Sequence, residues 1–302
     1  AEWYAPYPWQ ELRLAESPDL ETQATAYPTT IAVSEGLGWR TPEGVRGGLA
    51  FAVAAHEAAH QWWGHLLNIA EGPGTGMLAE GLADYSALLL IDAELGPQAR
   101  MAFARALEAQ YLAGRSTSRE RPILETSEDG TADESVLQKR GAWAMWMLHQ
   151  HLGERRTFAA LQQLIARHQR LGTAATPASL LESLRAVAPD PVALELEVAQ
   201  WLGSTALPEL AIDRSQCQRQ GTAWRCDAVI RNAGTGTISV DVDARRNGEA
   251  IADGRQRVML GAGRTARAQW TLSSRPDELV IDPEVRVLQR HRERARATIS
   301  ER

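Results

Sequence analysis

Hydrophobic residues recur at helical spacing through much of the chain before Pro208. This spacing predicts helices over the segments 77–95, 97–114, 134–151, 154–169, 177–187 and 190–203. Two of these helices have well-marked starts, at Thr176-Pro177 and Asp190-Pro191, because a polar side chain caps the first turn and proline fits its first position. The pattern therefore predicts a mostly helical region over residues 1–207.

Beyond Pro208 the hydrophobic pattern changes to short strand-like runs over 228–231, 238–244, 257–260, 266–272 and 278–281. Turns such as Asn247-Gly248 separate them. About six or seven short strands with regular turns predict an immunoglobulin-like β-sandwich, which we place over residues 208–290. Residues 291–302 are rich in arginine, and we expect a solvated tail or helix there, with a phosphate or lipid contact as the alternative.

A further apolar run, over residues 45–55, leads directly into the segment His56–His60. Thr41 is a suitable N-cap and Pro42 a suitable first helical residue, so we expect a helix from this point through the histidines. The alternative is a start nearer Gly48, because the pair Gly47-Gly48 weakens the first turn. Residues four apart lie on one face of a helix, one turn from each other. His56 and His60 therefore present two imidazoles on the same face.

The sequence His-Glu-x-x-His supplies two metal ligands and a base. Neutral imidazole is the commonest protein ligand for zinc. Glu57 lies beside His56, where its carboxylate can take a proton from a metal-bound water. A catalytic zinc site needs a third protein ligand. Our candidate is Glu80, which follows a glycine-rich turn and opens the next helical segment; the alternative for Glu80 is a solvent-facing acid at a helix start.

Other polar residues near these helices admit two interpretations. Asp84 lies one helical turn after Glu80, so its carboxylate either orients a ligand imidazole or lies in solvent. His149 and His151 are two apart in a predicted helix and face different sides. We expect these two histidines to be surface or interface residues.

The segment from His56 to Tyr85 resembles the M1 zinc aminopeptidases, a gluzincin family. The resemblance rests on His-Glu-x-x-His-Gln-Trp-x-Gly followed by Leu-x-Glu-Gly-x-Ala-x-Tyr. The segment 138–143 is similar to the family's Tyr-x-Lys-Gly helix. Residues 26–35 are similar to the segment before the zinc helix in M1-like domains fused to bacterial membrane transporter proteins.

The resemblance extends to the region of Trp201 and implies an α+β protein whose first part is a thermolysin-like metallopeptidase domain. It also implies one zinc ion per chain, held by His56, His60 and Glu80, and a peptide or protein substrate.

The chain departs from the family pattern at two positions near the expected catalytic residues. Residues 61–79 separate the second histidine from Glu80, one more than is usual in the family. The family's catalytic tyrosine aligns with Gln138, whose amide can donate to a developing oxyanion but with a different reach. Losing one such donor costs about a hundredfold to a thousandfold in turnover.

The family's Gly-Ala-Met-Glu-Asn strand, whose glutamate holds the free amine of a substrate, is not present. The corresponding stretch lies around Tyr27, and Glu35 is the nearest acid. We consider both as residues that bind substrate or support the site. Lys139 and Arg140 either line the cleft and hold a substrate carboxylate or lie in solvent.

Composition limits the partners and the context of the chain. The 302 residues carry a net charge of −6, with a pI near 5.7, which gives no case for nucleic acid. The apolar runs are far shorter than the roughly twenty residues that span a bilayer. The chain opens without Met and without a signal-peptide pattern. We expect it to be a processed or excised piece of a longer protein that carries an upstream β-rich domain and has a possible membrane-protein context. The oligomeric state stays open.

The two cysteines, Cys217 and Cys226, flank a Gly-Thr turn between strand-like runs. This spacing predicts a hairpin whose strands are joined by a disulfide. Disulfides persist in oxidising compartments, so we expect an extracytoplasmic (periplasmic) or membrane-associated location. Free thiols in the cytoplasm are the alternative.

These observations favour zinc-dependent peptide hydrolysis, with weak or altered exopeptidase activity. The alternative is a degenerate, non-catalytic peptidase-like domain that acts as an extracytoplasmic peptide-binding or interaction module of a membrane complex. The absence of a tyrosine at Gln138 favours the alternative, whereas the retained base Glu57 favours the enzyme.

Overall fold

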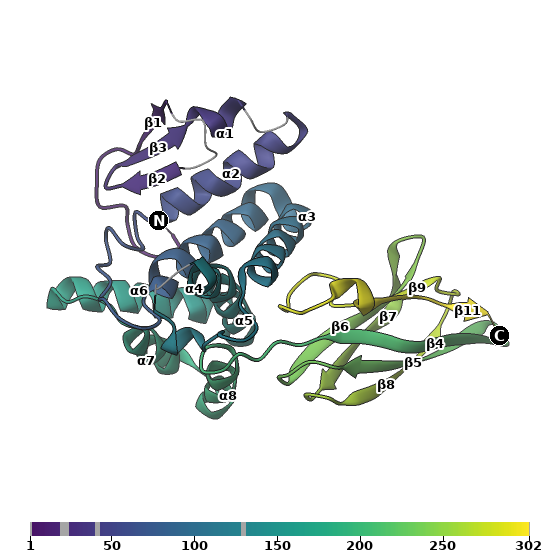
Figure 1. The fold of residues 1–302 in the computed structure, drawn as a ribbon. Coiled ribbons are helices and arrows are strands. Elements are labelled where there is room, and N and C mark those ends of the chain that lie inside the picture. The colour runs from purple at the N-terminus through teal and green to yellow at the C-terminus, as the bar shows by residue number, and fades with distance from the viewer. Residues whose placement is uncertain (1, 19–23, 40–42, 128–130, 302) are drawn as a thin grey trace. The chain divides into compact units, whose positions relative to one another are not determined.

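The computed structural model describes residues 2–18, 24–39, 43–127 and 131–301 (Figure 1). The chain forms two compact units, Ala1–Thr205 and Ala206–Arg302. This boundary lies close to the expected change at Pro208. Thr41 and Pro42, the expected start of the first long helix, lie outside the described residues. No helix among the described residues is long and apolar enough to cross a membrane.

The first unit opens with a small sheet that the hydrophobic pattern did not predict. Its strands are β1 (Arg13–Ser17), β2 (Ala24–Tyr27) and β3 (Thr30–Ser34). Their order is β1-β3-β2, with β1 parallel and β2 antiparallel to β3. A tight turn at Pro28-Thr29 joins β2 to β3, and Thr29 has a φ of 64°. Strand β2 is therefore an edge strand.

Helices make up the rest of the first unit and largely match the expected segments. The long helices are α2 (Glu43–Ala59), α3 (Leu82–Gly114), α5 (Gly141–Leu152), α6 (Glu154–Leu171), α7 (Pro177–Val187) and α8 (Pro191–Trp201). The short ones are α1 (Glu35–Trp39), η2 (Ile123–Glu125) and α4 (Thr131–Ser135). The expected caps are present, since the Thr176 side chain accepts from the N–H of Ser179 and the Asp190 side chain accepts from the N–H of Ala193.

Two π-helical turns at the starts of α3 and α5 pack against each other. The turn η1 (Met77–Gly81) leads into α3, and η3 (Val136–Arg140) leads into α5. A Cβ atom on Gly81 would lie 2.9 Å from the carbonyl oxygen of Leu137, and one on Gly141 would lie 2.9 Å from Cγ of Met77. A larger residue at Gly81 would therefore meet backbone and force the two turns apart, whereas at Gly141 the Met77 side chain would have to move. Turns of this type are frequent at functional sites.

The second unit consists of two four-stranded sheets, which confirms the predicted β-rich domain. One sheet has the order β10-β9-β6-β7 and the other β11-β4-β5-β8. The long strands are β4 (Leu210–Gln220), β5 (Ala223–Asn232), β6 (Ile238–Arg246), β7 (Glu249–Leu260) and β8 (Thr265–Leu272). The short ones are β9 (Glu278–Ile281), β10 (Arg296–Thr298) and β11 (Ser300–Glu301). The protein is thus α+β, as expected.

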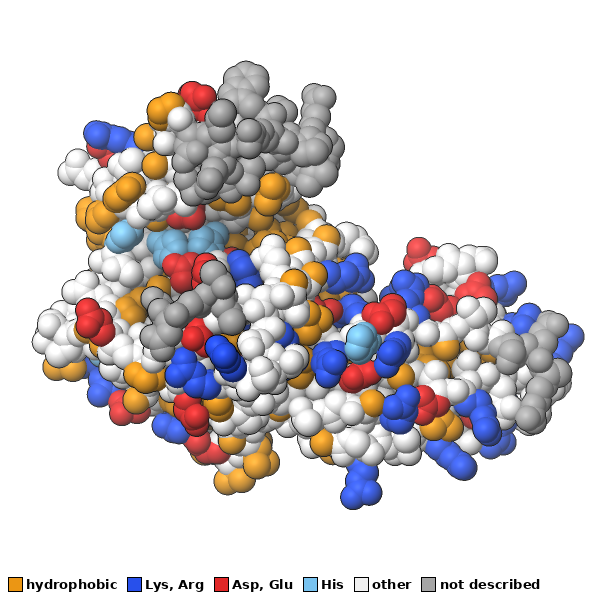
Figure 2. All heavy atoms as spheres, in the orientation of Figure 1, with side chains coloured by type: hydrophobic (Ala, Val, Ile, Leu, Met, Phe, Trp, Pro, Cys, Tyr) orange, Lys and Arg blue, Asp and Glu red, His pale blue; other side chains and the backbone are white. Residues whose placement is uncertain are grey.

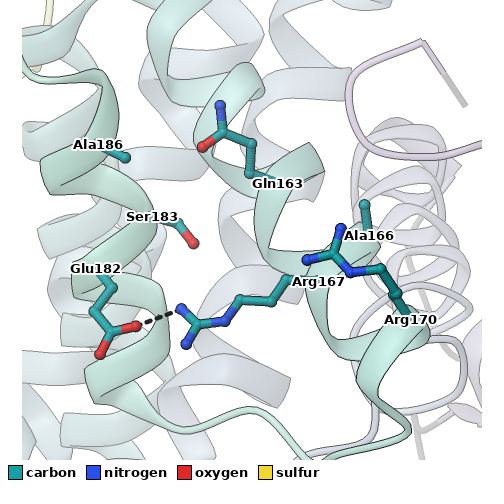
Figure 3. Close-up of a pocket in the computed structure, with 7 residues that line it drawn as sticks. All are labelled: Gln163, Ala166, Arg167, Arg170, Glu182, Ser183 and Ala186. Carbon is teal, nitrogen blue, oxygen red and sulfur yellow. Dashed lines mark hydrogen bonds and ion pairs between the residues drawn. The ribbon is translucent and has the colours of Figure 1, made fainter.

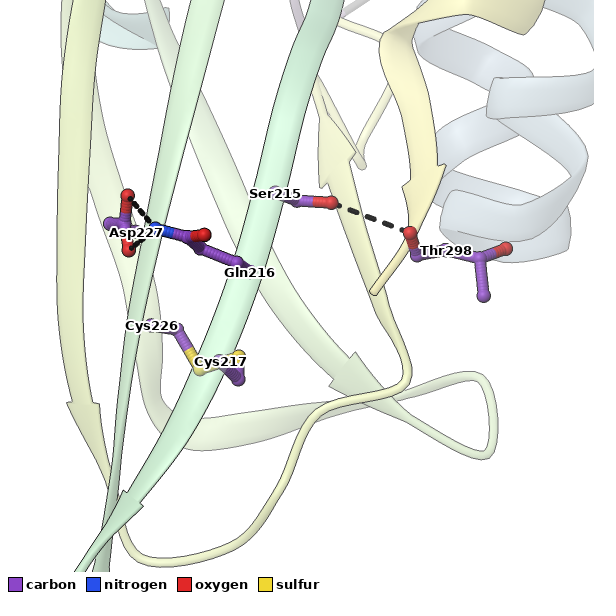
Figure 4. Close-up of a disulfide and its surroundings, with 6 residues drawn as sticks. All are labelled: Ser215, Gln216, Cys217, Cys226, Asp227 and Thr298. Atoms are coloured by element: carbon purple, nitrogen blue, oxygen red, sulfur yellow. Dashed lines mark hydrogen bonds between the residues drawn. A yellow bond between two sulfur atoms is a disulfide. The ribbon is translucent and has the colours of Figure 1, made fainter. Parts of the chain in front are cut away.

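The disulfide between Cys217 and Cys226 is present (Figure 4). The two residues are directly opposed on β4 and β5, with their Cα atoms 4.1 Å apart. Both side chains are buried. The predicted hairpin and its cross-link are therefore confirmed.

The arginine-rich segment after residue 290 differs from the expected separate tail. Strand β10 pairs with β9, and β11 pairs with β4. The 3-10 turn η4 (Arg292–Ala295) lies between β9 and β10, and its first residue, Arg292, forms an ion pair with Asp282. Arg296, the first residue of β10, forms an ion pair with Glu278. Arg294 bonds Glu209. Arg294 and Arg296 are more than half exposed, as the charge pattern predicted, but their carboxylate partners lie in the same unit. The segment is therefore part of the sandwich rather than a separate tail.

Candidate metal centre

The two histidines of the His-Glu-x-x-His segment meet at the end of α2. His56 lies in the last turn of α2, and His60 follows immediately after the helix. Their Nε2 atoms are 3.1 Å apart. Figure 2 shows histidine side chains gathered on one face of the molecule, beside acidic side chains. The helical spacing thus directs both imidazoles to one point.

Glu80 completes a set of three possible ligands. It lies in η1, with Oε2 3.3 Å from Nε2 of His56 and Oε1 3.5 Å from Nε2 of His60. One ligand atom from each of the three residues lies within 4.8 Å of the others, and no other such group of His, Cys, Asp and Glu occurs among the described residues. Two imidazoles and one carboxylate form the ligand set of catalytic zinc sites that keep a fourth position open. The residues therefore fit a zinc ion.

Each imidazole is held through the nitrogen that points away from this cluster. Nδ1 of His56 lies 2.7 Å from Oδ1 of Asp84, and Nδ1 of His60 lies 3.0 Å from the carbonyl oxygen of Trp63. An acceptor at Nδ1 fixes the tautomer that carries its proton there and leaves Nε2 free to bind metal. Both rings are thus oriented before any metal binds.

A buried ion pair lies behind His56. The second oxygen of Asp84, Oδ2, lies 2.9 Å from Nζ of Lys139, which is the only lysine in the chain. Asp84 is 3% exposed. Burial alone would raise the pKa of Asp84, but the hydrogen bond and charge of His56, together with Lys139, hold it below its usual value. Asp84 therefore remains an ionised partner for His56.

The same charges act on His56 and Glu80. Burial would lower the pKa of His56, but hydrogen bonds to Asp84 and Glu80 and the charges of both carboxylates raise it to about 10 in the metal-free protein. Burial likewise opposes ionisation of Glu80, and the two histidines outweigh it and lower its pKa. Groups of opposite charge therefore lie close together among these side chains.

Glu57 has the environment expected of a general base. Glu57 is buried, with 8% of its surface exposed. Burial raises the pKa of its carboxyl group, which the charges of His56 and His60 and a backbone hydrogen bond from Ala26 partly offset. A carboxylate with a raised pKa accepts a proton more readily near neutral pH.

The other predicted site residues are placed less centrally. Gln138 lies in η3, partly exposed, one residue before Lys139. Glu35 opens α1 and does not belong to the cluster of possible metal ligands found among the described residues. Tyr27 ends β2 with 55% of its surface exposed, and its carbonyl oxygen accepts a hydrogen bond from Gln61.

Arg140 differs from the expected cleft residue. It is 1% exposed, and its guanidinium group donates to the hydroxyl of Tyr111, to Glu120 and to the carbonyl oxygen of Ser204. These partners use most of its donors inside the helical unit. A role for Arg140 in binding a substrate carboxylate has no support in these contacts.

Sequence reasoning named Lys139 as a solvated or cleft-lining residue and Gln61 as part of the motif, but it missed the contacts through which both organise the centre. Lys139 contacts Asp84 across 55 positions of sequence, and Gln61 contacts the turn after β2. Gln61 immediately follows the second histidine, so its place in the motif was a signal. The status of Lys139 as the only lysine was another.

A pocket that none of these residues lines lies between α6 and α7 (Figure 3). Its volume is about 300 Å³. Arg167 and Glu182 form an ion pair across it, and Gln163, Arg170 and Ser183 also line it. It contains none of the predicted site residues. The paired charges leave no clear preference for an anion or a cation.

Comparison with known proteins agrees with this geometry. A family model for the peptidase family M1 domain matches residues 4–201. Among solved structures, an M1 zinc metallopeptidase E323A mutant from Deinococcus radiodurans, bound to a Tyr-Ser-Ala substrate, is similar, with a TM-score of 0.50 and 23% sequence identity. The match covers 67% of this chain and 41% of that chain, so it shows likeness of fold. No curated protein matches the sequence. On the family match, the chain belongs to peptidase family M1.

Proposed function

We propose that the first unit is a zinc peptidase that holds one zinc ion through His56, His60 and Glu80. The observation that carries this proposal is the convergence of these three side chains beside the buried carboxylate Glu57. A structural zinc site would usually be closed by four Cys or His ligands. Three ligands next to a base are typical of hydrolysis.

The residues of the chain can be given separate roles in that reaction. Zinc, when bound, polarises a peptide carbonyl and lowers the pKa of water. Glu57 takes a proton from the attacking water and gives it to the leaving amine. Asp84 and the carbonyl of Trp63 keep the two imidazoles in place. The amide of Gln138 is the candidate donor to the oxyanion.

We further propose that exopeptidase activity is weak or altered. Gln138 stands where the family's tyrosine is expected, and an amide has a different reach from a phenol. No acidic side chain occurs in β2, which reads Ala-Thr-Ala-Tyr. Free amines therefore lack the usual family partner in this strand.

The first experiment separates metal binding from catalysis. The purified protein should contain about one zinc per chain, and His60→Ala should lose most of it. Glu57→Gln should keep the zinc and lose cleavage of a peptide library. Zinc that stays stoichiometric when His56, His60 and Glu80 are all replaced by alanine would refute the ligand assignment. Undiminished cleavage by Glu57→Gln would show that activity lies elsewhere.

The second experiment tests Gln138. Turnover of an aminoacyl-arylamide panel should be low for the native protein and higher for Gln138→Tyr, because a phenol would then donate to the oxyanion. High native turnover would show that another donor replaces the tyrosine. Zinc binding without turnover in either protein would favour a non-catalytic, peptide-binding module.

We also propose an extracytoplasmic location in the context of a longer, membrane-associated protein. The disulfide between Cys217 and Cys226 supports an oxidising compartment. Thiol labelling of the protein in its native cells, without reduction, should leave both cysteines unmodified. Labelling of both would place the protein in a reducing compartment.

A further inference from the structure

Gln61, the residue after the second histidine, connects the zinc helix to the N-terminal sheet. It is fully buried, at 0% exposure. Its Nε2 donates to the carbonyl oxygen of Tyr27, and its Oε1 accepts from the backbone N–H of Thr29, each at 2.9 Å. One side chain thus holds both ends of the turn that closes the β2–β3 hairpin. Gln61 has no role in the proposed chemistry.

The hairpin that Gln61 holds lies against the catalytic base. The backbone of Ala26, one residue before Tyr27 on β2, lies close enough to Glu57 and to His65 to shift the pKa of both groups. Strand β2 is at the edge of its sheet, paired only with β3. Contacts from Gln61, Glu57 and His65 therefore place this edge strand beside the metal centre.

The chemistry of the contact suits an amide and no other common side chain. Glutamine offers one donor and one acceptor at fixed spacing, and the turn presents one acceptor and one donor. Glutamate would lose the donor, and methionine would lose both. A buried polar group without its partner is costly, so the two hydrogen bonds fix the hairpin at one position along the helix.

We infer that Gln61 is a positioning residue, which sets β2 against the zinc helix and so shapes the wall beside which a peptide substrate lies. This inference rests on the proposed zinc site, since the wall matters only if ligands bind there. An extended peptide can follow the edge of a sheet through its backbone. Displacement of β2 would weaken contacts to a peptide without changing the ligands of the metal.

A pair of zinc-binding probes isolates this effect. Acetohydroxamate contacts little beyond the metal, whereas a dipeptidyl hydroxamate also extends along the wall. Zinc-loaded Gln61→Met should bind the dipeptidyl hydroxamate about tenfold more weakly, the effect of one to two lost hydrogen bonds, and bind acetohydroxamate as the native protein does. Titration calorimetry measures both, and no turnover is needed.

The matched control is Gln162→Met. Gln162 also binds backbone oxygens of the N-terminal segment, those of Glu2 and Trp3, but it is exposed and does not contact β2. Affinity for both hydroxamates should stay native in this variant. If Gln61→Met fails to fold, Gln61→Glu keeps the acceptor for Thr29 and should show the same selective loss. Equal weakening of both probes, or no change in either, overturns the inference.

Hydrogen exchange supplies an independent measurement. The backbone amide of Thr29 should exchange faster in Gln61→Met than in the native protein, while amides of α6 keep their rates. If the native protein binds neither hydroxamate, the proposed zinc site fails, and this exchange still decides whether Gln61 holds the hairpin. A Thr29 amide that stays protected in Gln61→Met would show that other contacts hold the turn.

Discussion

Ion pairs at the metal centre and in the β-sandwich use the same chemistry in different surroundings. Behind His56, Asp84 is nearly inaccessible and each carboxylate oxygen has its own partner. On the sandwich, Arg257 and Asp241 also form a two-point contact, but the Arg257 side chain is 65% exposed. Water screens the second pair and not the first. Burial, rather than the number of charge pairs, therefore decides where a substitution matters.

The largest effect is expected when the buried pair is broken. Asp84→Ala leaves Lys139 without its carboxylate and His56 without its acceptor. We expect the metal-free protein to lose about 3 kcal/mol of unfolding free energy, and zinc affinity to fall about 10- to 100-fold. Urea unfolding and chelator competition measure these two quantities. Asp241→Ala is the control in the sandwich, and zinc affinity should be unaffected there. Native zinc affinity in Asp84→Ala would remove Asp84 from the centre.

A buried histidine should make the helical unit sensitive to acid. His149 lies in α5, and its Nδ1 is 2.7 Å from the hydroxyl of Tyr85. Burial lowers the pKa of His149 to about 4 in the folded protein, against about 6.5 when unfolded. The unfolded chain therefore binds a proton first, so the stabilising effect of neutral His149 is complete above pH 6.5 and is lost as pH falls towards 4.

This group alone should contribute a loss of about 3 kcal/mol between pH 6.5 and pH 4. The measurement is the pH dependence of the unfolding free energy. His149→Gln should flatten that dependence, whereas His151→Gln, at an exposed position of the same helix, should not. Equal slopes for the native protein and His149→Gln would show that other groups cause the acid sensitivity.

Removal of the disulfide should destabilise only the sandwich. In the chain-entropy description, a short closed loop stabilises by about 2 to 3 kcal/mol. We expect Cys217→Ala/Cys226→Ala to lose about 2 kcal/mol of unfolding free energy in the second unit, because the hairpin already holds these strands close. Zinc affinity should be native. A change in zinc affinity would mean that the two units are energetically coupled.

The smallest effect is expected at the exposed pair. Arg257→Met should change the unfolding free energy by less than about 0.5 kcal/mol, and added salt should reduce the difference further. A loss comparable to that of Asp84→Ala would contradict the distinction between screened and buried pairs. Urea unfolding at low and high salt makes this comparison.

The predictable parts of the structure are those that local patterns determine. Thr176-Pro177 and Asp190-Pro191 begin α7 and α8 as expected. The expected break between residues 95 and 97 is a kink at Gly96, whose φ of 81° is outside the helical range. The candidate metal ligands His56 and His60 could also be predicted from the sequence, because four-residue spacing on a helix is itself a geometric constraint.

Features that depend on contacts between distant segments could not be predicted from the sequence. Strand β1 is exposed along most of its length, so it lacks the alternation of buried and exposed residues that marks a strand. His149 is buried because Phe158 and Trp146 pack against its ring, which no local pattern indicates. The pairing of Arg140 with Glu120 likewise depends on how the helices pack. In each case tertiary packing decided the environment of the side chain.

Because the chain has a single lysine, the surroundings of the candidate metal centre can be labelled selectively. Amine-directed reagents react with neutral, accessible amines, and the only lysine amine in this chain is held by Asp84. Its side chain is 19% exposed. Acetylation, reductive methylation or an amine-reactive dye would therefore modify one side chain besides the α-amino group, and the rate of labelling at Lys139, read by peptide mapping, would measure how often the Lys139–Asp84 contact opens.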